Sequence, residues 1–309
     1  MISCCMPLSR KIPLLLSQKF ATIQAIASID SSWAHGKIVL DYLGDLERII
    51  DGLLPVDIQG NENLKIEYNR KRDKYTNWAE VMRLALFQYE RFAPNGFALS
   101  DGLYSSLVAA AAIWGRGEVK SISILGCGPG RTVLDFSRLF PSCEIVGVDY
   151  SLFSLMLAER IICGEESVPI LKRDVSSDDY SEVLMIPGMK RRNVSFECMD
   201  LDTDELPEAD IVVCSNIINL LSNHREIIYK IYHSVHSGGL VIFADLLGWR
   251  LDRNKGQKGI CTKDNVEFLF QEAGFSTLEC YSGVPYIESE SADQYTFYKE
   301  HIYIGRKPL

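Results

Sequence analysis

The chain lacks the features by which several large classes of protein are recognised. Its 309 residues include nine cysteines, but no C-x-x-C pair, and the odd number does not support a disulfide framework. No apolar run approaches the roughly 20 residues of a membrane helix. Gln18 and Lys19 interrupt the apolar stretch near the N-terminus, which disfavours a secretory leader. We therefore expect reduced cysteines and a cytoplasmic protein that does not enter a membrane.

Basic residues and histidines are also scarce. There are 32 Lys and Arg against 41 Asp and Glu, giving a net charge of −9 and a pI of about 5.2. No basic stripe with interleaved aromatic residues occurs, so nucleic acid is not expected as a partner. Of the five histidines, His233 and His236 share helical spacing without a third ligand nearby, and no Ser-His-Asp order is visible. We predict no metal site.

A glycine-rich turn is the most informative feature that is present. A short apolar run ends at Gly126, Gly128 and Gly130, and a second apolar run ends at Asp149. Glycines allow the backbone to approach a ligand where a Cβ would clash. A carboxylate can accept hydrogen bonds from both hydroxyls of a ribose. A glycine turn followed by an acid at the end of the next strand therefore predicts a nucleoside site.

The spacing of the glycines distinguishes between two kinds of nucleoside. Dinucleotide folds use G-x-G-x-x-G, in which the third glycine lets a helix pack closely on a strand. Here that position is Arg131, and the frame is instead Gly126-x-Gly128-x-Gly130. A large side chain at this position argues against a pyrophosphate on the following helix.

The glycine frame resembles motif I of class I S-adenosylmethionine (SAM) dependent methyltransferases. Further predicted elements follow in the order of that family over residues 119–309. They are a helix at 152–162, a strand at 194–199, an acidic loop at 200–207, a strand at 209–215, a helix at 225–236, a strand at 240–245, a helix at 263–274 and strands at 276–281 and 301–307. The resemblance implies an α/β fold with a Rossmann-like seven-stranded sheet and SAM as co-substrate.

The same resemblance assigns the cofactor residues. Asp149 would bind the ribose, Tyr150 would lie on the adenine face, and Asp200 would accept the adenine amino group. Ser215 and Asn216 would lie near the methionine part of SAM. The predicted cofactor-binding set is Gly126, Cys127, Gly128, Gly130, Asp149, Tyr150, Asp200, Leu201, Ser215 and Asn216.

The acceptor side is less defined. Tyr75, Tyr180 and Asp245 are possible general bases; in related enzymes an aromatic residue on an N-terminal helix often closes over the sulfonium, and Tyr75 could do so. A second group of residues could contact the acceptor, with core packing as the alternative for Trp78 and an ordinary surface position as the alternative for Arg250. That group is Trp78, Asn219 and Arg250.

We expect two domains. Residues 1–118 are predicted to be mostly helical and to form a lid or substrate domain, with residues 119–309 as the SAM-binding domain. Helices are predicted at 19–29, from a cap at Ser32 to about residue 54, and at 103–114. Residues 164–192 form an insertion that reads either as a solvated surface segment or as a flap over the acceptor.

The predicted function is methyl transfer to nitrogen or oxygen of a small molecule or short peptide, as in biosynthesis, by a monomer or homodimer. Two alternatives stay open. Tyr75-Thr-Asn-Trp78 and Leu247-Gly-Trp-Arg250 are faintly similar to nicotianamine synthases, which, like the methyltransferase-like azetidine-2-carboxylate synthases, use the aminocarboxypropyl group of SAM and release methylthioadenosine. A SAM-binding protein without turnover is the other alternative.

Overall fold

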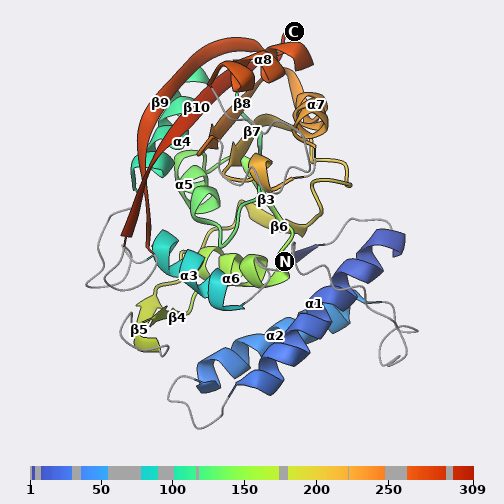
Figure 1. The fold of residues 1–309 in the computed structure, drawn as a ribbon, viewed down its shortest axis with the longest axis vertical. Helices are drawn as coiled ribbons and strands as arrows, with labels where there is room; N and C mark the ends of the chain where they lie inside the picture. Colours follow the sequence, from blue (N-terminus) through green and yellow to red (C-terminus); the bar gives the residue numbers. More distant parts are fainter. Residues whose placement is uncertain are drawn as a thin grey trace.

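A computed structural model shows a single large mixed sheet with helices on both faces (Figure 1). It describes residues 2–3, 8–29, 36–54, 78–89, 101–115, 118–173, 180–221, 223–247, 263–289 and 295–309. The strands, in their order across the sheet, are β1 (Ile2–Ser3), β6 (Val194–Cys198), β3 (Glu144–Asp149), β2 (Ser121–Leu125), β7 (Ala209–Ser215), β8 (Val235–Asp245), β10 (Tyr295–Arg306) and β9 (Ser276–Ser289).

Most strands of the large sheet are parallel. In the order just given, each strand is parallel to the next from β1 as far as β8, and β10 runs antiparallel to both β8 and β9. The strands β2, β7 and the second half of β8 are almost continuously buried, as expected for parallel strands covered on both faces. The predicted seven-stranded Rossmann-like sheet is confirmed, with the two-residue β1 added at one edge.

Two hydrophobic clusters cover the two faces of the sheet. One face packs against α7 (His224–Ser234) and α8 (Lys263–Ala273). The other face packs against α5 (Arg131–Leu139) and α6 (Leu152–Ile162). Side chains fix two of the helix starts: Ser151 accepts from the backbone of Ser154 at the start of α6, and Asn223 caps α7 in the same way.

Four N-terminal helices join the hydrophobic cluster that covers the second of these faces. They are α1 (Leu8–Ser28), α2 (Gly36–Leu53), α3 (Trp78–Tyr89) and α4 (Asp101–Trp114). Their apolar residues belong to the same continuous cluster as those of α5 and α6. The helix α1 begins 11 residues before the predicted start, because burial of Leu14 and Leu15 stabilises a longer helix. None of the described helices is long and apolar enough to cross a membrane.

The insertion at residues 164–192 contains a small antiparallel sheet. It is formed by β4 (Val168–Arg173) and β5 (Tyr180–Ile186), which lie beside α3 in Figure 1. The side chains of Ile170 and Leu171 are buried, and the hydroxyl of Tyr42 on α2 donates to the carbonyl of Pro169 over 2.8 Å. The insertion is therefore attached to the N-terminal helices, and it is not simply a solvated segment.

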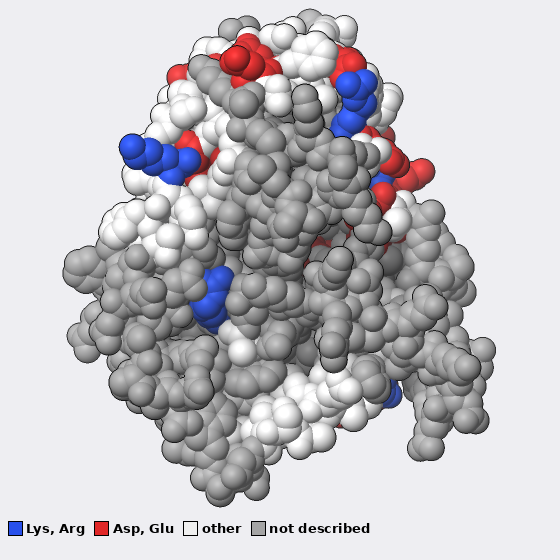
Figure 2. All heavy atoms as spheres, viewed as in Figure 1, with Lys and Arg blue, Asp and Glu red and all other residues white. Residues whose placement is uncertain are grey.

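The hairpin of β9 and β10 is longer than predicted. Both strands extend well beyond the expected residues 276–281 and 301–307, with a register shift between Glu300 and His301. The extra length carries Tyr286 to the region of α3 and α4. On the face shown in Figure 2, the visible charged side chains of the described residues are scattered, and the basic ones form no continuous area.

Candidate functional site

A cavity of about 210 Å³ lies at the carboxyl ends of β2, β3 and β7. Ligands of open α/β sheets bind at this edge. Nine of the ten predicted cofactor residues line the cavity, namely Gly126, Cys127, Gly128, Asp149, Tyr150, Asp200, Leu201, Ser215 and Asn216. The structure thus brings together residues that are up to 90 positions apart in the chain, from Gly126 to Asn216.

The glycine turn has the positive φ angles that favour glycine. Gly126 has φ 64°, and a Cβ there would lie 2.7 Å from the side chain of Ile217. Gly130 has φ 94°, but it is not among the residues that line the cavity. A Cβ on Gly130 would lie 2.8 Å from Ala158 and Ile162 of α6. Close packing of α6 therefore explains this third glycine, which was predicted to contact the cofactor.

Asp149 links the glycine turn to the loop after β3. One carboxylate oxygen accepts from the backbone N–H of Gly128 over 2.8 Å, and the other accepts from that of Ser151 over 2.8 Å. Burial raises the pKa of Asp149, although these backbone hydrogen bonds oppose the rise. A carboxylate has about four acceptor positions. Asp149 therefore keeps acceptor capacity for hydroxyl groups in the cavity.

The acidic loop after β6 is ordered by its own side chains. The backbone N–H of Asp200 donates to the Asp204 carboxylate over 2.8 Å, and that of Asp202 donates to the Asp200 carboxylate over 3.1 Å. Lys230 of α7 donates to the carbonyl of Leu201 over 2.9 Å. Asp204 is buried beneath the loop, while Asp200, Leu201 and Asp202 line the cavity.

The N-terminus of α5 is already occupied by the chain itself. The backbone N–H of Arg131 donates to the side-chain oxygen of Gln88 over 3.0 Å. The buried guanidinium of Arg131 binds Asp135 and the carbonyl of Gln88, and it lies 5.0 Å from the ring centre of Tyr104. A pyrophosphate needs free N–H groups at such a helix end. This arrangement disfavours a dinucleotide, as the sequence predicted from Arg131.

Asn216 has an unusual backbone conformation at the end of β7. Its φ is 54°, in the left-handed region that Asn adopts more readily than most residues. Its backbone N–H donates to the carbonyl of Ala244 over 2.9 Å, and its side-chain nitrogen donates to the buried carboxylate of Glu300 over 2.5 Å. These two bonds hold Asn216 at the cavity wall. Strained residues of this kind concentrate at functional sites.

The cavity has an apolar wall that the sequence did not reveal. Arg83 and Gln88 of α3 and Tyr104 of α4 contribute polar groups to it. Its apolar and aromatic members come from α3, α4, β9 and the 3-10 helix η3 (Ile218–Leu220) with its flanks. They are Leu84, Leu103, Tyr104, Ile217, Leu220, Leu221 and Tyr286. No local pattern marks these residues, since they meet only through the tertiary fold.

The predicted acceptor residues are placed less fully. Asp245 ends β8, is 1% exposed, and is not among the residues that line the cavity. Tyr180, Trp78 and Asn219 lie in β5, α3 and η3, but their side chains lie outside what the structure describes. Tyr75 and Arg250, like Ser32, lie outside the described residues. Their predicted roles stay predictions. The described residues include no group of three or more His, Cys, Asp or Glu that could hold a metal ion.

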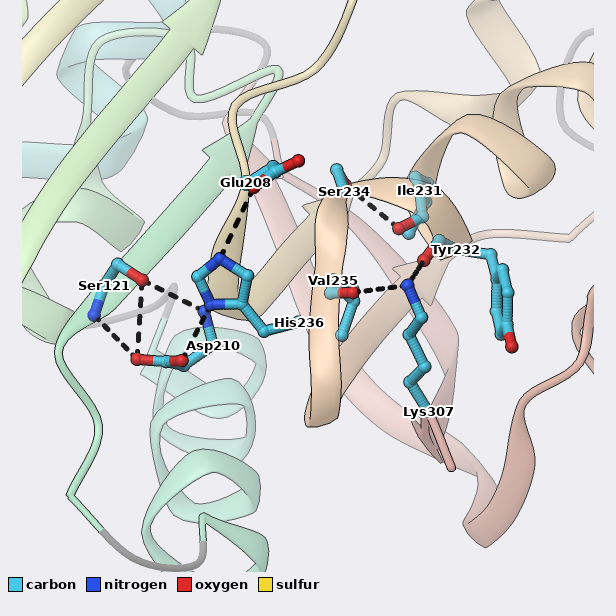
Figure 3. A network of polar contacts seen from close by, with 9 residues as sticks. All are labelled: Ser121, Glu208, Asp210, Ile231, Tyr232, Ser234, Val235, His236 and Lys307. Carbon is cyan, nitrogen blue, oxygen red and sulfur yellow. Dashed lines mark hydrogen bonds and ion pairs between the residues drawn. The ribbon is translucent and has the colours of Figure 1, made fainter. Parts of the chain in front are cut away.

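A second polar network lies at the opposite edge of the sheet (Figure 3). Asp210 accepts from the backbone N–H groups of Lys120 and Ser121, over 2.7 and 3.1 Å, and from Nδ1 of His236, which lies 2.9 Å away. Burial alone would raise the pKa of Asp210, but the hydrogen bonds from His236, Lys120 and Ser121 outweigh it and lower the pKa. The network joins the starts of β2, β7 and β8.

Known proteins provide an independent comparison. No protein-family model matches the chain. It is 23% identical over 163 residues to a malonyl-[acyl-carrier protein] O-methyltransferase of Bacillus cereus, covering 52% of this chain and 49% of that protein. The chain thus spans about half the length of the curated relative that it matches.

A solved structure shares the fold. The phosphoethanolamine N-methyltransferase 2 of Haemonchus contortus, in complex with SAM, superimposes with a TM-score of 0.50 at 13% identity, covering 80% of this chain and 62% of that one. The strand order of the sheet is β1-β6-β3-β2-β7-β8-β10-β9, and β10 is antiparallel to its neighbours. The chain has the Rossmann-like fold of class I SAM-dependent methyltransferases.

Proposed function

We propose that the chain is a SAM-dependent methyltransferase that acts on nitrogen or oxygen of a small molecule or short peptide. One observation carries the proposal. At the carboxyl edge of the sheet, Asp149 is bonded to the glycine turn on one side and to the next loop on the other, and it still has acceptor capacity toward the cavity. This is the arrangement that binding of an adenosyl ribose requires.

The remaining cavity residues fit the rest of SAM. Tyr150 and Leu201 can enclose the adenine, and the Asp200 carboxylate can accept from its amino group. The side-chain oxygen of Asn216 is buried and has no hydrogen-bond partner among the described residues. It is an acceptor for the ammonium group of the methionine half, which lies at this end in the proposed pose.

Methyl transfer requires mainly that the two reactants are held in position and that water is excluded from the reacting centre. SAM supplies a methyl group that is already activated by the adjacent sulfonium. The chain's residues hold the two reactants in line, which alone can contribute several kcal/mol to lowering the barrier. The apolar wall of Leu84, Leu103 and Ile217 keeps water from the reacting centre. A general base is needed only for an acceptor that is protonated at working pH.

The shape of the cavity supports a small acceptor. The cavity of about 210 Å³ is lined by side chains of α3, α4 and β9 as well as by the sheet, and a small acceptor would fit it better than a folded macromolecule. The Bacillus cereus relative is named for transfer to oxygen and the Haemonchus contortus enzyme for transfer to nitrogen. Both are consistent with this proposal, which leaves the choice between the two atoms to experiment.

Calorimetric titration and product analysis test the proposal. SAM and S-adenosylhomocysteine should bind to the purified protein with one site per chain, and NAD should not. After incubation with candidate acceptors, mass spectrometry should detect S-adenosylhomocysteine. Methylthioadenosine as the nucleoside product would instead indicate aminocarboxypropyl transfer. Failure of both SAM and S-adenosylhomocysteine to bind would contradict the proposal.

A further inference from the structure

We propose that Gln18 of α1 is a positioning residue for the adenosine half of the SAM site. In this view α1 is a fixed part of the cofactor site, in contrast to the lid predicted from the sequence. The inference rests on the proposed function, because it assumes that SAM occupies the cavity.

The side chain of Gln18 makes two hydrogen bonds to the loop after β3. Its nitrogen donates to the carbonyl of Tyr150 over 2.8 Å, and its oxygen accepts from the backbone N–H of Leu152 over 2.9 Å. The single amide group of Gln18 thus binds the carbonyl of Tyr150 and the N–H of Leu152. The backbone of a neighbouring strand would make the same pair of hydrogen bonds. Gln18 is only 3% exposed, so water cannot readily replace it at these bonds.

The loop that Gln18 binds is the one that would receive the adenosine. Tyr150, whose carbonyl Gln18 binds, and Ser151, which follows it, both line the cavity. The N–H of Ser151 donates to Asp149, and its hydroxyl caps α6. Leu152 carries one of the N–H groups that have no partner within a helix, at the first turn of α6. Gln18 provides that partner and so fixes the backbone from which Asp149 and Tyr150 project.

The helix α1 is itself held firmly. Leu15 is fully buried in the shared core, and Lys19 forms an ion pair with Asp51 of α2 over 2.5 Å. The helix α2 is attached to α6 in turn, since Asp45 pairs with Arg160. Gln18 is therefore presented to the loop from a scaffold that is anchored on both sides, which is what a positioning residue requires.

A second glutamine offers an internal comparison. Gln88 of α3 binds the N-terminus of α5 and lines the cavity near Gly128; in the pose proposed here, the methionine half of the ligand faces this part of the cavity. Gln18 and Gln88 thus brace opposite halves of the same site from two N-terminal helices. Replacing each should affect different parts of the ligand.

The test measures affinities of two ligands for three variants. S-adenosylhomocysteine contains both halves of the ligand, and 5′-methylthioadenosine lacks the amino-acid half. Gln18→Met, which keeps the length but removes both hydrogen bonds, should weaken binding of both ligands by about tenfold. Gln88→Met should weaken S-adenosylhomocysteine more than methylthioadenosine. Gln24→Met, at an exposed glutamine of α1, should leave both dissociation constants within about twofold of the original chain.

The outcomes separate this inference from the proposed function. If the unaltered chain binds neither ligand, the proposed function fails. If it binds both and Gln18→Met binds both equally well, only the role of Gln18 is wrong. Should Gln18→Met not fold, as judged by circular dichroism, Gln18→Asn decides. Its amide is one methylene shorter and cannot reach both Tyr150 and Leu152 from the same helix position, so both ligands should bind at least about threefold more weakly; unchanged affinity would overturn the inference.

Discussion

Two aspartates at opposite edges of the same sheet have opposite pKa shifts. Asp149 follows the carboxyl edge, where burial dominates and raises its pKa. Asp210 lies at the amino edge, where hydrogen bonds from His236, Lys120 and Ser121 overcome burial and lower its pKa. A carboxylate that is fully satisfied by its own chain stabilises the fold, whereas one that is buried and still has acceptor capacity is suited to a ligand.

The two edges differ in the same way beyond these two residues. At the amino edge, Lys307 donates to the carbonyl of Tyr232 in the last turn of α7 and to that of Val235, the first residue of β8, and its ammonium lies 4.6 Å from the Tyr232 ring centre (Figure 3). These contacts complete a helix end and leave little for a ligand. At the carboxyl edge, Asn216 has a strained backbone and an acceptor without a partner among the described residues. In this fold, contacts that stabilise the protein lie at the amino edge, and the groups suited to binding a ligand lie at the carboxyl edge.

Replacing Asp149 should have the largest effect, and it tests the contrast between Asp149 and Asp210 most directly. Asp149→Ala removes the acceptor for the ribose hydroxyls, and hydrogen bonds to charged groups contribute about 1.5–3 kcal/mol each. The dissociation constant of SAM should rise about 100-fold, as measured by calorimetry. The free energy of unfolding without ligand should fall by about 1–2 kcal/mol, because Gly128 and Ser151 lose their acceptor as well, so affinity is measured at a temperature where the variant is folded. Unchanged affinity would mean that Asp149 does not bind the ligand.

Asp210→Ala should show the reverse behaviour. It removes the acceptor for Lys120, Ser121 and His236, so the free energy of unfolding should fall by about 2 kcal/mol. Urea denaturation measures this change. The affinity for SAM should stay within about twofold, because the residue lies at the other edge of the sheet. A large loss of affinity in a folded Asp210→Ala protein would show that the two edges are coupled.

As the pH falls, the affinity for SAM should decrease before the stability contributed by Asp210 is lost. The carboxylate form of Asp149 accepts the ribose hydroxyls, so SAM affinity should fall as pH falls through its raised pKa, by at most about tenfold per pH unit. The stability from Asp210 is present above its unfolded pKa of about 3.9 and is lost as pH falls through its lowered folded pKa. Calorimetry and thermal unfolding over a pH series check this order, and simultaneous loss would contradict it.

Tyr89→Phe should have the smallest effect and would sharpen the account of the carboxyl edge. The hydroxyl of Tyr89, on α3, is fully buried and donates to the carbonyl of Pro129 in the glycine turn over 2.8 Å. Its loss should cost about 1 kcal/mol of unfolding free energy and weaken SAM binding two- to threefold, about 0.5 kcal/mol. Parallel denaturation and titration measure both. An effect on stability alone would show that the turn holds its shape without α3.

The sequence predicted the parts of the site that depend on local pattern. The apolar strands before Gly126 and Asp149 and the acid that follows β6 are readable because strand, turn and helix signals lie within about ten residues of each other. Gly130 shows the limit, since the same glycine serves helix packing against Ala158. A glycine in a motif does not reveal which neighbour requires it.

The contacts of Gln18 and Gln88 and the apolar wall of the cavity were not predictable in this way. Gln18 meets Tyr150 across 132 residues and Gln88 meets Arg131 across 43, so no spacing rule connects them. A glutamine within an amphipathic helix reads as a solvent-facing residue. Tyr286 was missed because β9 continues past its predicted end through pairing with β10. Tertiary pairing, and not local propensity, sets that length.

A crystal structure with S-adenosylhomocysteine tests the central claim most directly. The account predicts that both ribose hydroxyls lie within hydrogen-bonding distance of the Asp149 carboxylate, with the adenine between Tyr150 and Leu201. A ligand found elsewhere on the molecule, or a cavity that stays empty at millimolar ligand, would contradict it.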